Sequence, residues 1–303
     1  MPRMSPILER IYKSRGLDPE IVAHFEDLES WAVRSIRSTL ADTPRAARAY
    51  DLLAADEEVR AYWEMANYMT VVKLGFNDHG ETHAKIAAAY SLSILRLLQE
   101  AGVEADLVAD GLGDADDAFL VVLVAALLHD IGNQAGRTGH EAIGVHLALP
   151  VLDRLLSTIY DSVEKRAKIT ALIAHAILAH DLDSPPLTLE AAVVAVGDGA
   201  DLTKGRGRIA FDLGKVDIHS VSALAIQKVE IRAGEACPVE ILITMSNSAG
   251  VFQVEQTLTT KVLSTPLRDL VTVTAVVEAA GDEPVLERMT LQDGRFVVPG
   301  GTA

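Results

Sequence analysis

The chain has 303 residues and a formal net charge of −16, with 43 acidic residues against 27 basic ones. Such an acidic chain excludes general binding to nucleic acid or anionic lipid, because both require a basic surface. The single cysteine, Cys237, excludes an intrachain disulfide and a thiolate metal cluster. Residues 1–20 are mixed polar and charged, unlike a signal peptide. We therefore expect a cytoplasmic globular protein.

Residues 1–60 carry apolar and charged residues in helical mixtures, with a break expected at Pro44. Between Glu81 and Ala101, apolar residues recur at three- and four-residue spacing, which predicts an amphipathic helix ending before Gly102. A Gly/Asp-rich loop follows. The run Phe119–Leu128 then holds no polar residue, which predicts a buried helix. It is about half the ~20 residues that a membrane span needs, so no membrane association is expected.

Three more helices are expected before residue 205. The first begins at His140 and is expected to bend or end at Pro150, because proline lacks the backbone N–H of a helix interior. The other two are predicted at Thr158–Ala179 and Leu187–Lys204.

The pattern changes after about residue 205. Gln227–Arg232 alternates between apolar and charged residues, and Val239–Met245 is rich in branched residues, so the two predict a hairpin. A helix at Ala249–Leu263 and a strand at Leu270–Val277 are expected to follow. The predicted fold class is mainly α, a helical bundle with a smaller C-terminal α+β domain.

We divide the chain into three parts. Residues 1–60 form an N-terminal helical extension, and residues 61–205 form a helical domain that contains the candidate metal ligands. Residues 206–303 form the α+β domain, with a hairpin, a helix, a strand and an extended tail.

An ionisable pair, His129 and Asp130, stands at the end of the apolar run. Burying such a pair is costly unless it is compensated, and a divalent cation compensates it well because imidazole and carboxylate are both good ligands. His83 and Asp198 lie on apolar faces of their own predicted helices. Two histidines and two aspartates from facing helices can enclose one octahedral ion and leave positions for water or substrate. The alternative is a buried network of hydrogen-bonded polar side chains.

The order of these residues, with the string Ala125-Ala126-Leu127-Leu128-His129-Asp130-Ile131-Gly132, resembles the HD superfamily of metal-dependent phosphohydrolases. The resemblance covers about residues 60–210 and implies an HD-type helical bundle. The segment Lys204–Ile209 and the α+β tail are similar to a branch of predicted phosphohydrolases in which such a tail follows the HD domain. The resemblance implies four metal ligands and a catalytic role for Asp130, which can contact two ions. The four ligands are His83, His129, Asp130 and Asp198.

One of the four ligands has a rival, and further histidines are candidate ligands of a second ion. His79, one helical turn before His83, is the rival for the first ligand. Branches with two metals take further histidines from the regions of His140 and of His175 and His180. We prefer His140 and His175 as these ligands, since His175 and His180 are five residues apart and do not share a helix face. The Gly-Tyr-Pro element of the related cyclic-dinucleotide phosphodiesterases is absent after His180, which argues against that substrate.

The expected cofactor is one or two divalent ions, drawn from Mn, Mg, Fe, Co, Ni and Zn, with no other cofactor. Lys204, Arg206 and Arg208 form the densest basic cluster in this acidic chain, and phosphate oxygens favour such side chains. Further candidates for binding the substrate are Arg137, His180 and His79.

The expected function is hydrolysis of a phosphomonoester or phosphodiester, with a nucleotide as the expected substrate, by metal-activated water. Two alternatives remain open: an HD-type di-iron oxygenase that uses mixed-valent iron, and a non-catalytic nucleotide sensor. The expected partner is a small phosphorylated molecule. The C-terminal domain is a candidate homodimer interface or a candidate lid over the site.

Overall fold

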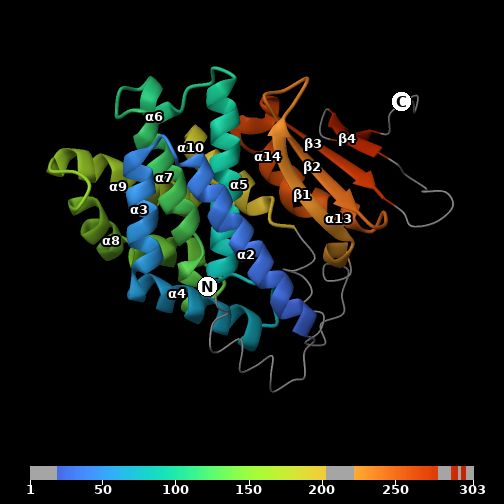
Figure 1. Ribbon diagram of the computed structural model, residues 1–303, viewed down its shortest axis with the longest axis horizontal. Helices are drawn as coiled ribbons and strands as arrows, with labels where there is room; N and C mark the ends of the chain where they lie inside the picture. The colour runs from blue at the N-terminus through green and yellow to red at the C-terminus, as the bar shows by residue number, and fades with distance from the viewer. Residues whose placement is uncertain (1–18, 203–221, 279–287, 293–294, 298–303) are drawn as a thin grey trace.

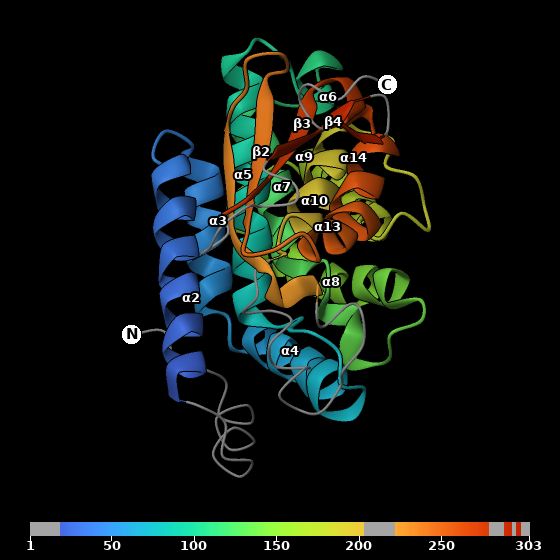
Figure 2. The ribbon, with the colours of Figure 1, turned by 90° about the vertical axis from the view of Figure 1, so that its right-hand side faces the viewer.

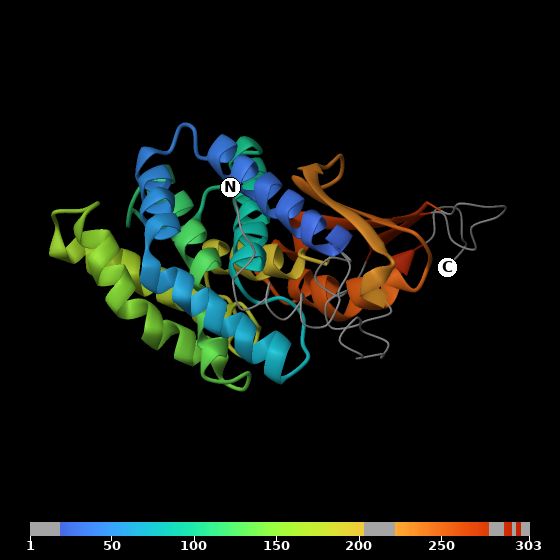
Figure 3. The ribbon, with the colours of Figure 1, turned by 60° about the horizontal axis from the view of Figure 1, so that its bottom comes forward.

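The fold is mainly α, a helical bundle followed by a smaller α+β part with a five-stranded sheet. The computed structural model describes residues 19–202, 222–278, 288–292 and 295–297 (Figure 1). The helices gather at one end of the long axis and the sheet at the other, with α2 running along the outside between them (Figure 3). Within the described ranges, no helix has both the length and the apolar character that a bilayer crossing requires.

The bundle follows the helical pattern of the sequence. The predicted helix at Glu81–Ala101 is confirmed, and Gly102 after it has a φ of +81°, a left-handed conformation that glycine adopts without strain. The elements in chain order are α2 (Pro19–Thr39), α3 (Pro44–Ala55), α4 (Glu57–Asn67), η1 (Tyr68–Lys73), α5 (Glu81–Glu100), α6 (Asp106–Ala109), α7 (Ala115–Leu128), η2 (Ile131–Gln134), α8 (His140–Ser157), α9 (Val163–Ala179) and α10 (Leu189–Gly199).

Helix α7 is the centre of the bundle. Every residue from 117 to 128 is buried, and the helix packs against α3, α5, α9 and α10. A helix that is apolar on all sides requires such a position. Its start is fixed by a capping box between Asp114 and Asp117. Near its end, the indole Nε1 of Trp63 donates a hydrogen bond to the carbonyl of Leu127 at 2.8 Å, which ties the end of α7 to α4.

Three predicted boundaries differ from the structure. Helix α8 continues through Pro150 to Ser157, so it does not end at the proline, which was one of the two expected outcomes. The residues Val151 and Leu152 beyond the proline are buried, so their packing offsets the backbone hydrogen bond that proline cannot make. Helix α9 begins at Val163 instead of residue 158, because the Ser162 side chain caps it by accepting from the Lys165 N–H. Helix α10 ends at Gly199 instead of residue 204.

The predicted hairpin is confirmed, and its two strands form the first pair of the sheet. β1 and β2 are antiparallel, with Val229 opposite Ile243. β2 and β3 are parallel, and a helical crossover of α13, η3, α14 and η4 joins them. The bounds are β1 (Ile226–Ala233), β2 (Val239–Met245), α13 (Gly250–Gln253), η3 (Val254–Thr259), α14 (Thr260–Leu263), η4 (Pro266–Asp269), β3 (Val271–Val277), β4 (Arg288–Gln292) and β5 (Arg295–Val297).

The C-terminal part packs on the bundle through two helices. Strand β1 contacts α5, where the Tyr90 hydroxyl donates to the carbonyl of Val229 at 3.3 Å. The crossover segments η3, α14 and η4 contact α10, and α14 lies next to α10 (Figure 2). Helices α5 and α10 therefore have two roles. They support the C-terminal part, and they carry two of the four candidate ligands, His83 and Asp198.

Replacing Trp63 with Phe should destabilise the protein, because the buried carbonyl of Leu127 then loses its donor. We expect a decrease of about 1–3 kcal/mol in the free energy of unfolding, measured by urea denaturation. The matched control is Trp31→Phe, which leaves the Trp63 hydrogen bond in place. Equal stability of the Trp63 variant and the wild type would show that this bond does not hold the end of α7.

Candidate metal centre

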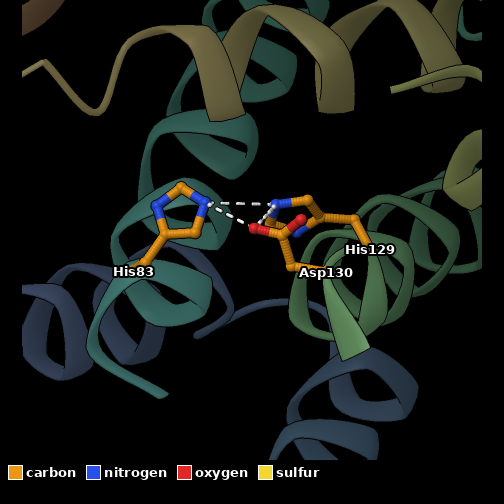
Figure 4. A group of neighbouring side chains, drawn as sticks. All are labelled: His83, His129 and Asp130. Atoms are coloured by element: carbon orange, nitrogen blue, oxygen red, sulfur yellow. Dashed lines mark hydrogen bonds and ion pairs between the residues drawn. The ribbon is translucent and has the colours of Figure 1, made fainter. Parts of the chain in front are cut away.

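Four candidate ligands converge at one point inside the bundle, and Figure 4 shows three of them, His83, His129 and Asp130. His83 from α5 meets His129 and Asp130 from the end of α7, and Asp198 from α10 completes the group. The His83 Nε2 atom lies 3.2 Å from His129 Nε2, 3.3 Å from Asp130 Oδ2 and 3.1 Å from Asp198 Oδ1. The His129 Nε2 atom lies 3.2 Å from Asp130 Oδ2 and 3.6 Å from Asp198 Oδ1. We call these four residues the first half of the centre.

The other carboxylate oxygen of Asp130 faces a second pair of histidines. Asp130 Oδ1 lies 3.3 Å from His140 Nε2 and 3.7 Å from His180 Nε2, and the two Nε2 atoms are 3.1 Å apart. We call Asp130, His140 and His180 the second half. All the side chains of both halves are buried. Asp130 therefore stands between two groups of histidines, with one oxygen toward each.

Tight backbone turns place the second half beside the first. A Cβ on Gly132 would lie 1.9 Å from the carbonyl oxygen of His140, so only glycine allows α8 to start this close to the His-Asp turn. Gly139, the residue before α8, has a φ of +73°. The Asn133 side chain donates to Asp130 Oδ1 at 2.7 Å and to the Asp130 carbonyl at 3.1 Å, which fixes the carboxylate.

The Nδ1 atoms of the histidines are all engaged with acceptors. His83 Nδ1 donates to Asp201 Oδ2 at 2.7 Å. His129 and His180 each donate to a backbone carbonyl three residues earlier, both at 2.7 Å. His140 Nδ1 is 2.9 Å from Glu141 Oε2. A proton on each Nδ1 leaves the Nε2 lone pairs pointing into the centre, which is the arrangement of metal-binding histidines.

This donor set fits a divalent cation. Two neutral imidazoles with Nε2 lone pairs about 3 Å apart repel each other unless a proton or a cation lies between them. Neighbouring ligands around one ion at roughly 2.0–2.1 Å are separated by about 2.8–3.4 Å, and the separations between the ligand atoms of the first half are 3.1–3.6 Å. Imidazole with carboxylate suits Zn, Mn, Fe, Co and Ni.

The same atoms allow more than one grouping. Among the residues that the structure describes, three triads have all their ligand atoms within 4.8 Å of one another, and one of these triads combines residues of both halves. The centre therefore has enough donors for one ion or for two. The triads are His83, His129 and Asp130; Asp130, His140 and His180; and His129, His180 and Asp198.

Charge in the metal-free centre is balanced internally. Burial opposes charge on His129, but the Asp130 and Asp198 carboxylates outweigh it and raise the pKa of His129 to about 9. Burial would raise the pKa of Asp130, but positive charge on His129 holds that pKa well below its usual range. Burial and the charge of His129 hold the pKa of His180 well below its usual range.

The structure corrects the preference for His175 over His180. His175 Nε2 accepts the backbone N–H of Leu187 at 2.9 Å, and the residue belongs to none of the described metal-ligand groups. Helix α9 ends at Ala179, so His180 is its C-cap, and its ring turns back to His140. Spacing on an uninterrupted helix could not show this turn.

The remaining candidates lie at the edge of the centre or outside the described residues. His79 is buried with its ring 5.8 Å from that of His83, and its Nδ1 contacts the carbonyl of Asn77 at 2.6 Å. Arg137 Nη1 contacts His140 Nε2 at 2.9 Å. Lys204, Arg206 and Arg208 lie outside the described residues.

Two supporting residues were not among the predicted site residues. Asp201 orients His83, and its position one turn after Asp198 was a sequence signal for it. Asn133 orients Asp130, and its place three residues after Asp130 was the only signal. Such partners fix ligand orientation and tune ligand basicity.

Comparisons with known proteins identify the family of the chain. The HD domain profile matches residues 91–202, a segment that contains every residue of the two halves except His83. An uncharacterized protein of Methanocaldococcus jannaschii, MJ1020, is 40% identical over 242 residues, which cover 80% of this chain and 92% of that protein. No solved structure matches the chain. The chain belongs to the HD-domain superfamily. The members of this superfamily are mostly metal-dependent hydrolases.

His180→Ala should weaken metal binding, and His175→Ala should not. The first variant removes one of the three donors of the second half, whereas the second removes only a surface hydrogen bond to Leu187. We expect the affinity for an ion held by the second half to fall at least about tenfold in the His180 variant alone. The metal content of each variant after dialysis measures this loss. Equal losses in both variants would contradict the assignment of His180.

Metal binding should release a proton from His129. In the metal-free protein its pKa of about 9 lies above the ordinary 6.5, so the proton stabilises the fold fully below pH 6.5 and this contribution is lost as the pH rises through about 9. A bound ion must displace this proton, so metal affinity should rise about tenfold per pH unit from pH 7 to 9. Calorimetry in buffers of different ionisation enthalpy measures the proton count, and a binding enthalpy independent of the buffer would contradict it.

Proposed function

We propose that this protein is a metal-dependent phosphohydrolase that hydrolyses phosphomonoesters or phosphodiesters, with nucleotides as its substrates. The observation that carries the proposal is the position of Asp130, whose two oxygens each face a separate pair of histidine Nε2 atoms. A carboxylate with these neighbours can serve two ions at once. The family supports the reaction class, and the choice of nucleotides rests on the resemblance in sequence.

The residues that would hold the ions are those of the two halves. His83, His129, Asp130 Oδ2 and Asp198 Oδ1 would hold the first ion, and Asp130 Oδ1, His140 and His180 would hold the second. A divalent ion, when bound, lowers the pKa of water and neutralises phosphate oxygens. Asp130 is the proposed catalytic residue because it belongs to both halves.

The chain supplies a guanidinium for the phosphate at the rim of the centre. The Arg137 side chain is 35% exposed, and its Nη2 donates to Asp181 Oδ2 at 3.0 Å. Its Nη1 lies 3.9 Å from Asp130 Oδ1 and faces the second half. Arginine offers several donors in one plane, which suits the oxygens of a phosphate. We propose that Arg137 orients the substrate phosphate, and that His79 lines the opposite side beside His83.

Asp130→Asn and His129→Ala should each abolish most phosphate release and leave the fold intact. We expect a decrease of at least about a hundredfold in kcat/KM, since second-shell changes alone cost 10–100-fold in such centres. The measurement is a phosphate-release screen over nucleotides and simple phosphate esters with Mn, Mg, Co and Fe. Asp153→Asn, at an exposed position of α8, is the control and should keep full activity.

Two further measurements on the same protein would identify the alternative functions. Oxygen consumption by protein loaded with two irons, without phosphate release, would indicate an HD-type oxygenase. Tight nucleotide binding without turnover in metal-replete protein would indicate a sensor. Full hydrolysis by both variants would place the reaction at another site and contradict the proposal.

A further inference from the structure

Lys261 of helix α14 reaches the candidate metal centre from the C-terminal part of the chain. Its Nζ atom donates to Asp198 Oδ2 at 2.5 Å, while the other oxygen of Asp198 faces His83 Nε2 at 3.1 Å. The side chains of Lys261 and Asp198 are only 10% and 11% exposed. One carboxylate thus joins the histidines of the bundle to an ammonium group 63 residues further along the chain.

The path of this side chain depends on a glycine. A Cβ on Gly199 would lie 2.9 Å from the Lys261 Cδ atom, so the lysine stem crosses α10 where that helix has no side chain. The packing of α14 on α10 brings the stem to this point. A larger residue at Gly199 would push the ammonium away from Asp198.

Burial makes the lysine depend on a negative partner, because an isolated buried ammonium is strongly disfavoured. The other buried lysine of the described core, Lys85, has two glutamates, Glu29 and Glu81, for this purpose. The carboxylate that meets Lys261 is instead a candidate metal ligand. The charge of Lys261 also contributes to holding the pKa of Asp198 well below its usual range, against the effect of burial.

We propose that Lys261 is a positioning residue of the metal centre. Its ammonium group occupies Asp198 Oδ2, so Asp198 would present Oδ1 alone to a bound ion, which would leave a coordination position for water or substrate. The C-terminal α+β part is therefore a component of the centre, and its crossover helices set the denticity of one ligand. The inference rests on the metal centre of the proposed function but not on turnover.

The test uses the full-length protein loaded with Co(II), whose visible bands weaken as the coordination number rises. In Lys261→Met, Asp198 Oδ2 loses its ammonium donor and the ion loses a nearby positive charge. We expect weaker visible bands, because Asp198 can then offer both oxygens, and Co(II) binding that is at least about tenfold tighter, because the repulsion between the ammonium and the ion is removed. A purely structural loss would weaken binding instead. Lys261→Arg keeps a charged donor and should keep the wild-type spectrum.

Two further variants complete the design. Lys228→Met removes an exposed lysine from strand β1 and should change neither the spectrum nor the affinity. If Lys261→Met does not fold, Lys261→Gln keeps a neutral donor of similar length, and tighter Co(II) binding is expected there too. Circular dichroism and thermal unfolding verify the fold of each variant.

The results separate the two proposals. A wild-type spectrum and affinity in Lys261→Met would overturn the positioning role, as would weaker binding together with lower thermal stability. A raised KM with an unchanged resting spectrum would also overturn it and show that Lys261 contacts the substrate. Failure of the wild-type protein to bind Co(II) at all would instead overturn the metal centre itself.

Discussion

The convergence of histidine lone pairs and carboxylates in a buried core is the constraint on which the rest of the structure depends. Each imidazole has its Nδ1 hydrogen bonded to an acceptor, so its Nε2 points at another ring or at Asp130. Without positive charge at this point, two buried carboxylates and repelling lone pairs would oppose folding. The protonation of His129 and the ammonium of Lys261 supply part of that charge in the metal-free protein.

The fold places the donors by holding a few helices rigidly together. The apolar helix α7 is enclosed on all sides, and the hydrogen bond from Trp63 fixes its C-terminal end. Helices α5 and α10, which carry His83 and Asp198, pack against each other, and Gly197 allows this close approach, since a Cβ there would lie 2.0 Å from Ser91 Oγ. Glycines thus appear where two elements must approach more closely than side chains permit.

Much of the bundle could be predicted because it depends on local pattern. The apolar run before His129 and Asp130 indicated a buried helix, and the faces of the neighbouring helices indicated His83 and Asp198. The choice between His175 and His180 failed because it depends on where α9 ends, and a helix end is set by caps and packing as much as by periodicity. Lys261 carried no sequence signal, since only the packing of α14 on α10 brings it to Asp198.

Anomalous diffraction from crystals of the protein equilibrated with Mn(II) tests the central claim most directly. The account predicts an anomalous peak in coordination distance of His83 Nε2, His129 Nε2, Asp130 Oδ2 and Asp198 Oδ1. A centre without any peak, in which these side chains keep the separations of the metal-free protein through hydrogen bonds alone, would contradict it.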